Sequence, residues 1–439
     1  MADDMVVGVD IGTTKVCAVV ARRDELGRIN ILGVGLAQSH GLNRGVVVNI
    51  DRTVSAVQQA VQEAERMAGV KVQRVFAGIA GDHVQSFQSR GVVTISNPEG
   101  EISQDDVRRL IEDTTHVAMP ADREILHVIP QEFIVDGQDG VFDPVGMSGV
   151  RLEANVHIIT GLVSAARNIH RCIERAGYNV ADVVLEPLAS SRAVLHDDEK
   201  EVGVALIDIG GGTTDMAIFE DSTIRHTAVV AVAGNKVTDD IRRGLGVMRD
   251  QAEALKCQFG IAMANALEQE EEILIPGIGG RNEKSIRRGA LAQIIQPRLE
   301  EILEIAAIEI KRSGYARHLS AGAVITGGGS LIPHIADLAA DILGMDCRVG
   351  VPMGVSGGLV EEVGDPKFAT AVGLVMQGFK TLERDAIAST SADDSSAGAR
   401  GLDEESSQQG AAPSDIDESS FSPGKKSLLD RMRGWFDEF

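Results

Sequence analysis

Two turns of nearly the same sequence, each placed between apolar stretches, constrain the fold of this chain more than any other feature. The first is Asp10-Ile-Gly-Thr-Thr-Lys15, and the second is Asp208-Ile-Gly-Gly-Gly-Thr-Thr-Asp215. Glycine loses more backbone freedom on folding than any other residue, so glycine runs persist where the backbone must approach another group closely. Two copies of one turn predict a duplicated chain whose halves close on a common ligand from opposite sides.

The chemistry of both turns indicates a phosphate and a metal ion. Consecutive backbone N–H groups form a cradle for anions, whereas carboxylates repel them. Carboxylates beside a bound phosphate make sense when a hard cation such as Mg²⁺ lies between the two. One such turn alone would equally be an ordinary hairpin turn, but the pair favours a nucleotide site.

Composition sets the class of protein. A chain of 439 residues is expected to form at least two domains, and 44% hydrophobic with only 3% aromatic residues favours aliphatic α/β layers. A net charge of −23 argues against nucleic acid as a main partner. The four cysteines show no metal-binding or disulfide spacing, so we expect small buried side chains in a reducing cytoplasm. No signal peptide and no membrane-spanning run are expected.

The first half is expected to begin with strands near 5–11, 15–22 and 29–37, followed by a helix that starts at Asp51, a good N-cap. In the second half, residues 284–313 predict a long helical stretch.

A region of about residues 83–161 interrupts the first half. It combines expected strands at 91–95, 124–135 and 150–160 with a helix capped by Ser103. Its histidines, among them His116, His127 and His157, are scattered, which favours ordinary histidines over a metal site. A compact insert without a catalytic cluster predicts a protein-contact module.

Two further motifs belong to the expected site. Glu186 ends the expected strand 180–185 where the chain turns into a helix, which suits a group that orients water, although a solvated loop glutamate is the alternative. Gly327-Gly-Gly-Ser-Leu-Ile332 follows the expected strand 322–326. A strand, three glycines and a helix suit close approach to a ribose and adenine or to an α-phosphate.

The end of the chain differs in composition. Residues 384–424 are acidic and almost devoid of aliphatic side chains, so they predict a flexible linker. Residues 425–439 predict an amphipathic helix that anchors at a membrane surface, and a helix that docks on the folded part or on a partner is the alternative. The apolar face of this helix comprises Leu428, Leu429, Met432, Trp435, Phe436 and Phe439, and the basic residues are Lys425, Lys426, Arg431 and Arg433.

Several motifs resemble those of a known family. The glycine turns and Glu186-Pro-Leu-Ala-Ser190 are similar to the actin/Hsp70/sugar-kinase ATPase superfamily. Within it, Ile125-Leu-His-Val-Ile-Pro-Gln-Glu-Phe133, Asp143-Pro-Val-Gly-Met-Ser-Gly-Val-Arg-Leu152, Asn155-Val-His-Ile-Ile-Thr160, Gly234-Asn-Lys-Val-Thr-Asp-Asp-Ile241 and the amphipathic end resemble the FtsA family of bacterial cell-division proteins. The resemblance covers nearly all of residues 5–382 and the terminal helix.

The resemblance implies an α/β, duplicated actin-like (ribonuclease-H-like) ATPase fold with two halves around a nucleotide cleft and a family-specific insert. Its subdomains would be 1A at 1–82 and 162–200, with 366–382 packing back on it, 1C at 83–161, 2A at 201–235 and 305–365, and 2B at 236–304. The implied function is an ATP-binding protein that polymerises on the cytoplasmic side of the cell membrane at the division site. It would anchor the ring of the tubulin-like protein FtsZ through 2B and recruit later division proteins through 1C, with at most slow ATP turnover.

The family's site residues carry over to matching positions. Asp10 and Asp208 would hold Mg²⁺, Glu186 would orient water, and Gly234 and Asn235 would approach the ribose, with Asn235 standing where actin has Asp. The phosphate contacts would be Gly12, Thr13, Thr14, Lys15, Gly210, Gly211, Gly212, Thr213 and Thr214. The nucleoside pocket would comprise Glu253, Lys256, Gly327, Gly328, Gly329, Ser330 and Ile332. Lys15, just past its turn, can equally point to solvent.

Three other functions remain open from sequence. A sugar kinase or other phosphotransferase of the superfamily needs a catalytic base and a small-molecule pocket, for which the first half offers no candidate. An Hsp70-like chaperone needs a folded peptide-binding domain after the ATPase, where this chain has its acidic segment. A pilus-assembly relative would carry the same insert but no basic terminal helix.

Overall fold

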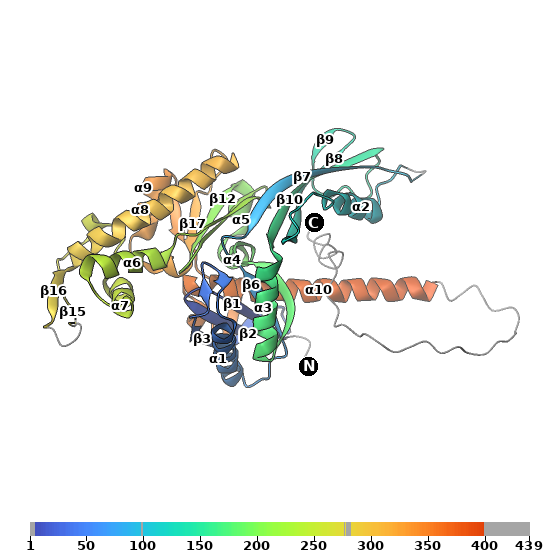
Figure 1. Ribbon diagram of the computed structural model, residues 1–439. Coiled ribbons are helices and arrows are strands. Elements are labelled where there is room, and N and C mark those ends of the chain that lie inside the picture. The colour runs from blue at the N-terminus through green and yellow to red at the C-terminus, as the bar shows by residue number, and fades with distance from the viewer. Residues whose placement is uncertain (1–4, 98–99, 276, 278–281, 399–439) are drawn as a thin grey trace, which may run out of the picture. The chain divides into compact units, whose positions relative to one another are not determined.

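The computed structural model describes residues 5–97, 100–275, 277 and 282–398, with side chains as far as residue 384 (Figure 1). The chain divides into two compact units, Met1–Gly378 and Phe379–Phe439, and the whole candidate site lies in the first. None of the helices in the described ranges is both long enough and apolar enough to cross a membrane.

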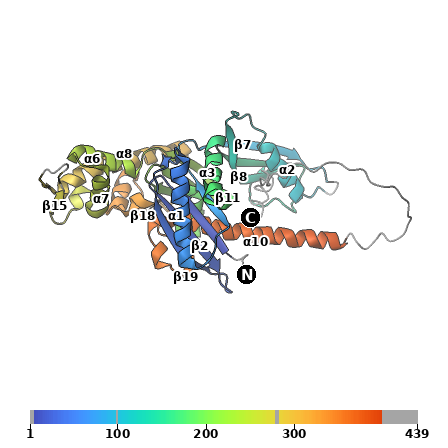
Figure 2. The ribbon, with the colours of Figure 1, turned by 60° about the horizontal axis from the view of Figure 1, so that its bottom comes forward.

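The first half is built on a six-stranded mixed sheet with the strand order β11-β6-β1-β2-β3-β19. Strands β1, β2 and β3 form an antiparallel meander, β6 joins β1 in parallel and β11 joins β6 in parallel. Helix α1 lies against this sheet (Figure 2). The elements are β1 Met5–Ile11, β2 Lys15–Arg23, β3 Ile29–Gln38, β4 Leu42–Asn43, β5 Val46–Val47, α1 Ile50–Ala68, β6 Arg74–Ile79, α3 Val163–Ala176, β11 Asn179–Leu185, α4 Glu186–Val194, α5 Asp197–Val202 and β19 Val355–Gly358.

The second half repeats this plan on a five-stranded sheet with the order β14-β13-β12-β17-β18. Strands β12, β13 and β14 form the antiparallel meander, β17 joins β12 in parallel and β18 joins β17 in parallel. The elements are β12 Val204–Ile209, β13 Thr214–Glu220, β14 Thr223–Val230, β17 Ala323–Thr326, η3 Gly328–Leu331, α9 Ile335–Leu343 and β18 Cys347–Val349. In each half, therefore, the first strand of an antiparallel meander pairs on its other side with a parallel strand, and a second parallel strand follows. This shared plan confirms the duplicated α/β fold predicted from the turns.

An antiparallel sheet of order β7-β10-β8-β9 is inserted after β6 and rejoins the first half at α3. Helix α2 covers it, and its N-terminus is a capping box in which Ser103 and Asp106 bond each other's backbone N–H groups, so the predicted cap is confirmed. The elements are β7 Gln85–Thr94, α2 Gln104–Thr114, β8 Arg123–Val135, β9 Gln138–Val141 and β10 Arg151–Leu162.

A mainly helical region follows β14 and packs on the second half, sharing its apolar core through Val237, Ile241 and Leu291. The long helix α8 runs from this region back onto the sheet, and its buried face includes Leu299 and Leu303. The elements are α6 Gly234–Leu245, α7 Arg249–Phe259, η1 Ala264–Ala266, β15 Glu272–Ile275, β16 Lys284–Arg287 and α8 Arg288–Ser313.

Several expectations about element ends are wrong. Asn49, not Asp51, caps α1, because the Asn49 side chain accepts from Arg52 N while Asp51 lies inside the first turn. The short strand β16 replaces the expected start of α8 at residue 284. After η4 (Glu361–Val363) and η5 (Pro366–Phe368), α10 (Ala369–Gly398) begins later than residue 366 and continues into the stretch from 384 that predicted a flexible linker. The rest of that linker and the terminal helix 425–439, with all its predicted membrane-contacting residues, lie outside the described residues.

Candidate functional site

The two glycine turns have the same hairpin geometry. In the first, Ile11 pairs with Val16 and Gly12 N donates to Lys15 O at 3.0 Å. In the second, Ile209 pairs with Thr214 and Gly210 N donates to Thr213 O at 2.9 Å. Position by position, Thr13 and Thr14 of the first turn therefore correspond to Gly211 and Gly212 of the second.

The two turns contact each other reciprocally. A Cβ atom on Gly211 would lie 2.3 Å from Thr14 Cγ2, and one on Gly212 would lie 2.4 Å from Thr13 Oγ1. The first of the two central residues in each turn (Thr13 or Gly211) thus faces the second central residue (Gly212 or Thr14) of the other turn. This is the pattern of a contact with local twofold symmetry. The contact between the halves therefore requires glycine at these positions, in addition to the anion cradle that the turns predict.

Buried carboxylates gather behind the turns. Asp10 and Asp208 are 6% and 8% exposed, and Asp208 lies beside Gly327, where a Cβ would come within 2.2 Å of Asp208 Oδ1. Burial and the neighbouring Asp10 charge raise the pKa of Asp208 to about 6. Asp10 and Asp208, which were predicted to hold one cation, therefore lie close enough for the charge of one to affect the pKa of the other.

Asp215 belongs to this group, although the predicted site did not include it. It is 4% exposed, it pairs with Asp208 across the hairpin, and burial together with the Asp208 charge raises its pKa to about 8. Thr213 Oγ1 donates to Asp215 Oδ2 at 2.8 Å, while Oδ1 has no hydrogen-bond partner among the described residues. The signal in the sequence was its place at the end of the turn, opposite Asp208 in a hairpin.

Lys15 faces these carboxylates and not bulk solvent. Its Nζ lies 3.0 Å from Asp10 Oδ2, and the side chain keeps 28% of its exposure. Burial, the largest single effect, would lower the pKa of Lys15, but the charge and hydrogen bond of Asp10 together with Cys17 and Asp208 raise it overall. One ammonium group does not balance the surrounding carboxylates, so the environment favours an additional cation.

Glu186 is the first residue of α4 and not a loop residue. It follows the last residue of β11, and the end of β6 lies beside it, where a Cβ on Gly78 would be 3.0 Å from Glu186 Cγ. Burial, then the charges of Asp10 and of the two aspartates of the second hairpin, raise the pKa of Glu186 well above its usual range, although the residue keeps part of its exposure to solvent. A carboxyl group that is poised to take a proton suits the predicted water-orienting role.

Helix α6 bonds the second turn directly, and α7 bonds the start of α6. Gly234 N donates to Gly210 O at 3.1 Å and Asn235 N donates to Gly211 O at 2.8 Å. Lys256 Nζ bonds Gly234 O at 3.3 Å and Glu253 Oε2 at 2.8 Å. Burial, the largest single effect, tends to raise the pKa of Glu253, but the Lys256 charge and the hydrogen bonds from Lys256, Thr238 and Cys257 together lower it. The structure thus brings these four predicted residues together at one turn.

The third glycine turn reaches the same place because β17 pairs with β12, with Thr326 opposite Asp208. Gly327 has a φ of 80°, a conformation that favours glycine. The chain then forms the 3₁₀ turn η3, so the predicted helix does not begin at the glycines. Ser330 Oγ donates to Gly327 O at 2.8 Å and Ile332 is buried in the core of the second half, so both side chains support the turn from within.

The threonine hydroxyls are also largely engaged within the protein. Thr214 Oγ1 donates to Val232 O at 2.8 Å and Thr13 Oγ1 accepts from Gly45 N at 3.0 Å. Thr14 is exposed, and among the threonines of the two turns it is the one with an exposed side chain. Phosphate contacts at the other threonine positions would therefore come from the backbone.

Asp10, Asp208 and the orphaned Asp215 Oδ1 fit a hard cation, since Mg²⁺ takes oxygen ligands and keeps several waters. Within the described residues, no group of three or more His, Cys, Asp and Glu side chains is placed to hold an ion by itself. An ion at this point would accordingly complete its coordination with water and with oxygens of a bound phosphate.

Comparison with known proteins identifies the family. The family model "Cell division protein FtsA" matches residues 205–373, and the model "SHS2 domain inserted in FTSA" matches residues 81–160. The cell division protein FtsA of Pseudomonas aeruginosa is 44% identical over 86% of this chain and 89% of its own length. FtsA of Escherichia coli K12 is 39% identical over 85% of this chain and 90% of its own.

Solved structures share the fold at lower identity. The PilM-PilN type IV pilus biogenesis complex aligns with a TM-score of 0.61 and 16% identity over 85% of this chain and 98% of that chain. MreB 5 of Spiroplasma citri bound to AMPPNP aligns with a TM-score of 0.53 and 15% identity, over 88% and 99% of the two chains. With its actin-like halves and its inserted sheet, and with relatives this similar over most of its length, the chain belongs to the FtsA family of cell division proteins.

Proposed function

We propose that the protein is an ATP-dependent scaffold of cell division, which polymerises on the cytoplasmic side of the cell membrane. The observation that carries this proposal is the reciprocal contact of the two glycine turns over the buried pair Asp10 and Asp208. A ligand bound at this contact touches both halves at once, so its presence changes the angle between them. An angle set by a nucleotide is a direct way to control which subunits fit together.

ATP with Mg²⁺ fits the residues at this place. The N–H groups of Gly211 and Gly212 and the Lys15 ammonium would hold phosphate oxygens, and Asp10 and Asp208 would hold the ion through its waters. Gly234, Asn235, Glu253, Lys256 and the turn after β17 would contain the ribose and base. A bound Mg²⁺ would neutralise the carboxylates of Asp208 and Asp215, whose pKa values are raised by burial and then by repulsion from neighbouring carboxylates. The nucleotide in the related fold of Spiroplasma MreB 5 supports this assignment.

Turnover of ATP would be slow. We assign Glu186 to orient the attacking water, and burial together with the neighbouring aspartates raises its pKa well above its usual range. The slow turnover itself is an expectation from the resemblance to the FtsA family. We therefore assign the nucleotide mainly a structural role.

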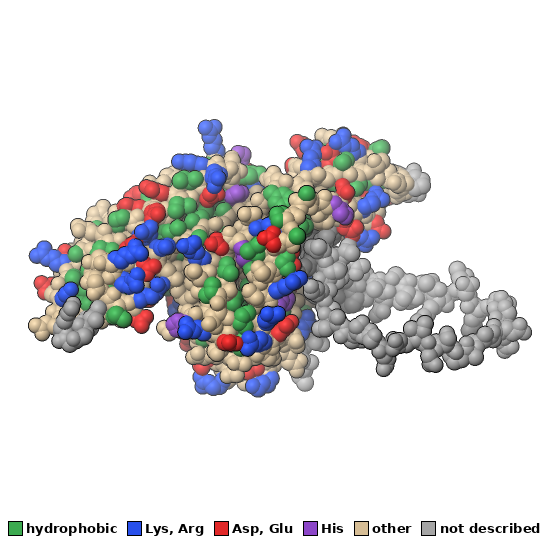
Figure 3. Space-filling view, viewed as in Figure 1, with side chains coloured by type: hydrophobic (Ala, Val, Ile, Leu, Met, Phe, Trp, Pro, Cys, Tyr) green, Lys and Arg blue, Asp and Glu red, His purple; other side chains and the backbone are tan. Residues whose placement is uncertain are grey.

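We assign subdomains 1A, 1C, 2A and 2B to the residue ranges that the resemblance to the FtsA family implies. Subdomain 2B, residues 236–304, is proposed as the contact for the tail of FtsZ. Its exposed residues include the basic Arg243, Arg249 and Arg287 and the apolar Met248 and Leu274, which are 58% and 66% exposed. Figure 3 shows Lys and Arg side chains gathered on this part. A mixture of cationic and apolar groups suits a short peptide. Subdomain 1C, residues 83–161, is proposed as the contact for later division proteins.

The anchor to anionic lipid would be the amphipathic helix 425–439. Its basic and apolar residues are those of an interfacial helix, and binding strength scales with buried apolar area and with attraction to anionic headgroups. The similarity to the PilM-PilN complex supports a shared fold and not a pilus-assembly function. Membership of the FtsA family argues against that alternative.

Electron microscopy on anionic lipid monolayers tests membrane, nucleotide and polymer together. The full chain with ATP and Mg²⁺ is expected to form filaments on the lipid, whereas Asp208→Ala is expected to bind lipid without assembling, and a chain ending at residue 424 to leave the lipid bare. Asp341→Ala, at an exposed aspartate, serves as the matched control. Unchanged ATP affinity of Asp208→Ala in equilibrium binding would contradict the assigned nucleotide site.

A further inference from the structure

Strand β8 of the inserted sheet contacts the first half next to Glu186. The ring nitrogen His127 Nε2 accepts a hydrogen bond from the backbone N–H of Leu185 at 3.0 Å. Leu185 is the last residue of β11, and Glu186 follows it directly as the start of α4. Any displacement of β8 at His127 therefore acts on the backbone that positions Glu186.

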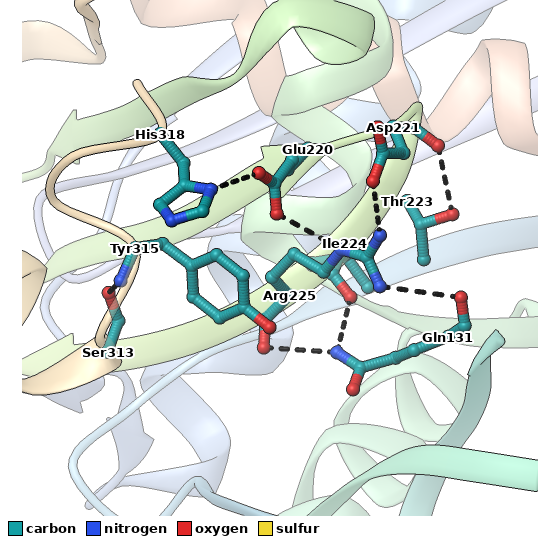
Figure 4. A network of polar contacts seen from close by, with 9 residues as sticks. All are labelled: Gln131, Glu220, Asp221, Thr223, Ile224, Arg225, Ser313, Tyr315 and His318. Carbon is teal, nitrogen blue, oxygen red and sulfur yellow. Dashed lines mark hydrogen bonds and ion pairs between the residues drawn. The ribbon is translucent and has the colours of Figure 1, made fainter. Parts of the chain in front are cut away.

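The same strand contacts the second half four positions further along. Gln131 is 4% exposed, and its Nε2 donates to Ile224 O at 2.8 Å and to Arg225 O at 3.1 Å on β14 (Figure 4). Strand β14 is the edge of the second sheet, so its outward carbonyl groups lack a further strand to bond. A side chain of the insert satisfies them instead.

The pairing of β8 explains why Gln131 points to β14. Opposite β10, Pro130 pairs with Val156 and Glu132 pairs with Asn155, so Gln131 is left out of the ladder as an extra residue. Such a bulge interrupts the regular alternation of side chains along a strand and so changes the direction in which a side chain points. A second residue of the insert bonds the same strand, since Ser86 Oγ donates to Thr227 O at 3.0 Å.

The attachment point on β14 is braced from the other side. Arg225 bonds Asp221 Oδ2 at 2.8 Å through Nη2, and Glu220 Oε1 lies 2.6 Å from His318 Nδ1, as the polar network in Figure 4 shows. From this braced end β14 runs back to the site, where Val229 pairs with Asp215. Strand β14 therefore connects Gln131 with the second glycine turn through regular secondary structure.

We propose that β8 is a strut between the two halves, which couples nucleotide occupancy to the inserted sheet. This inference rests on the proposed nucleotide site. A nucleotide that changes the separation of the halves cannot leave both ends of β8 in place, because His127 is bonded to one half and Gln131 to the other. Since coupling is reciprocal, a protein that binds the insert changes nucleotide affinity by the same factor as the nucleotide changes the affinity of that protein.

Amide hydrogen exchange of the full chain, with and without Mg²⁺ and a non-hydrolysable ATP analogue, tests the strut. The analogue is expected to slow exchange in the two hairpins and to change exchange within residues 123–135 by about fivefold or more. Gln131→Leu is expected to remove the change in 123–135 while the protection of the hairpins remains. Gln138→Leu, at an exposed glutamine of the same insert, is expected to behave as the wild type.

His127→Leu releases the other end of the strut and is expected to give the same loss, which guards against a local folding defect in Gln131→Leu. If the analogue slows exchange in the hairpins of the wild type but does not change exchange in residues 123–135, the strut is overturned and the nucleotide site stands. The same conclusion follows if the change in residues 123–135 persists in both variants. Hairpins without protection would overturn the nucleotide site and the strut with it.

Discussion

The first and second glycine turns share one backbone geometry but carry different side chains. The first carries two threonines and Lys15, and the residue that pairs with its aspartate is Cys17. The second carries bare glycines at the tip, and the residue that pairs with its aspartate is Asp215. Because the turns meet tip to tip, side chains can occupy only one of them. The first turn thus supplies a cation and side chains at its tip, whereas the second supplies open backbone at its tip and an additional carboxylate.

The largest effect on ATP affinity is expected from adding a side chain to the tip of the second turn, as the first turn has. Gly211→Ala places a methyl group 2.3 Å from Thr14 Cγ2, so the Thr14 side chain or the turns themselves must move. Overpacking of this kind costs on the order of 2 kcal/mol, so ATP affinity is expected to fall about 30-fold. Binding titrations measure the loss. The double variant Gly211→Ala with Thr14→Gly is expected to recover most of the affinity, whereas Gly364→Ala, where a methyl group meets only ordinary contacts, keeps it. No recovery in the double variant would contradict the reciprocal contact.

A smaller effect is expected from removing the additional carboxylate. The pKa of Asp215 is raised to about 8, so between its usual value and pH 8 the folded protein holds a proton that the unfolded chain has released. Stability of the nucleotide-free protein must therefore fall as the pH rises through this window. Asp215→Asn is expected to flatten that fall and to raise the melting temperature at pH 8 by about 3 °C or more. Melting curves from pH 5 to 8 check this, and parallel wild-type and variant profiles would refute it.

The smallest effect is expected at the corresponding position of the first hairpin. Cys17 is fully buried, and burial raises the pKa of its thiol to about 12, so it brings no charge to the site. Cys17→Ala is expected to lower stability by about 1 kcal/mol and to leave ATP affinity within about twofold. Denaturant unfolding and nucleotide titration measure the two quantities. A tenfold loss of affinity would mean that the two hairpins are functionally alike at this position.

Patterns within single segments predicted most of the fold and part of the site. Strands β1, β2 and β3 lie close to the expected ranges, and Ser103 caps α2 as predicted, because apolar alternation and capping depend on neighbouring residues. The cap of α1 was misassigned because Asn49 and Asp51 are both good capping residues and only the geometry distinguishes them. Asp215, one of the two carboxylates that flank the second turn, was left out of the predicted metal residues because its burial depends on strands that are distant in sequence.

The sequence by itself determined that there are two phosphate-type turns on a duplicated α/β chain, since glycine and aspartate between apolar strands restrict what a hairpin can do. Only the tertiary structure decided that the turns touch, that Asp215 joins Asp10 and Asp208, and that β8 bonds both halves through His127 and Gln131. The reason is physical: a local pattern fixes the shape of a segment, whereas burial, pKa shifts and contacts between halves arise from the summed packing of distant segments.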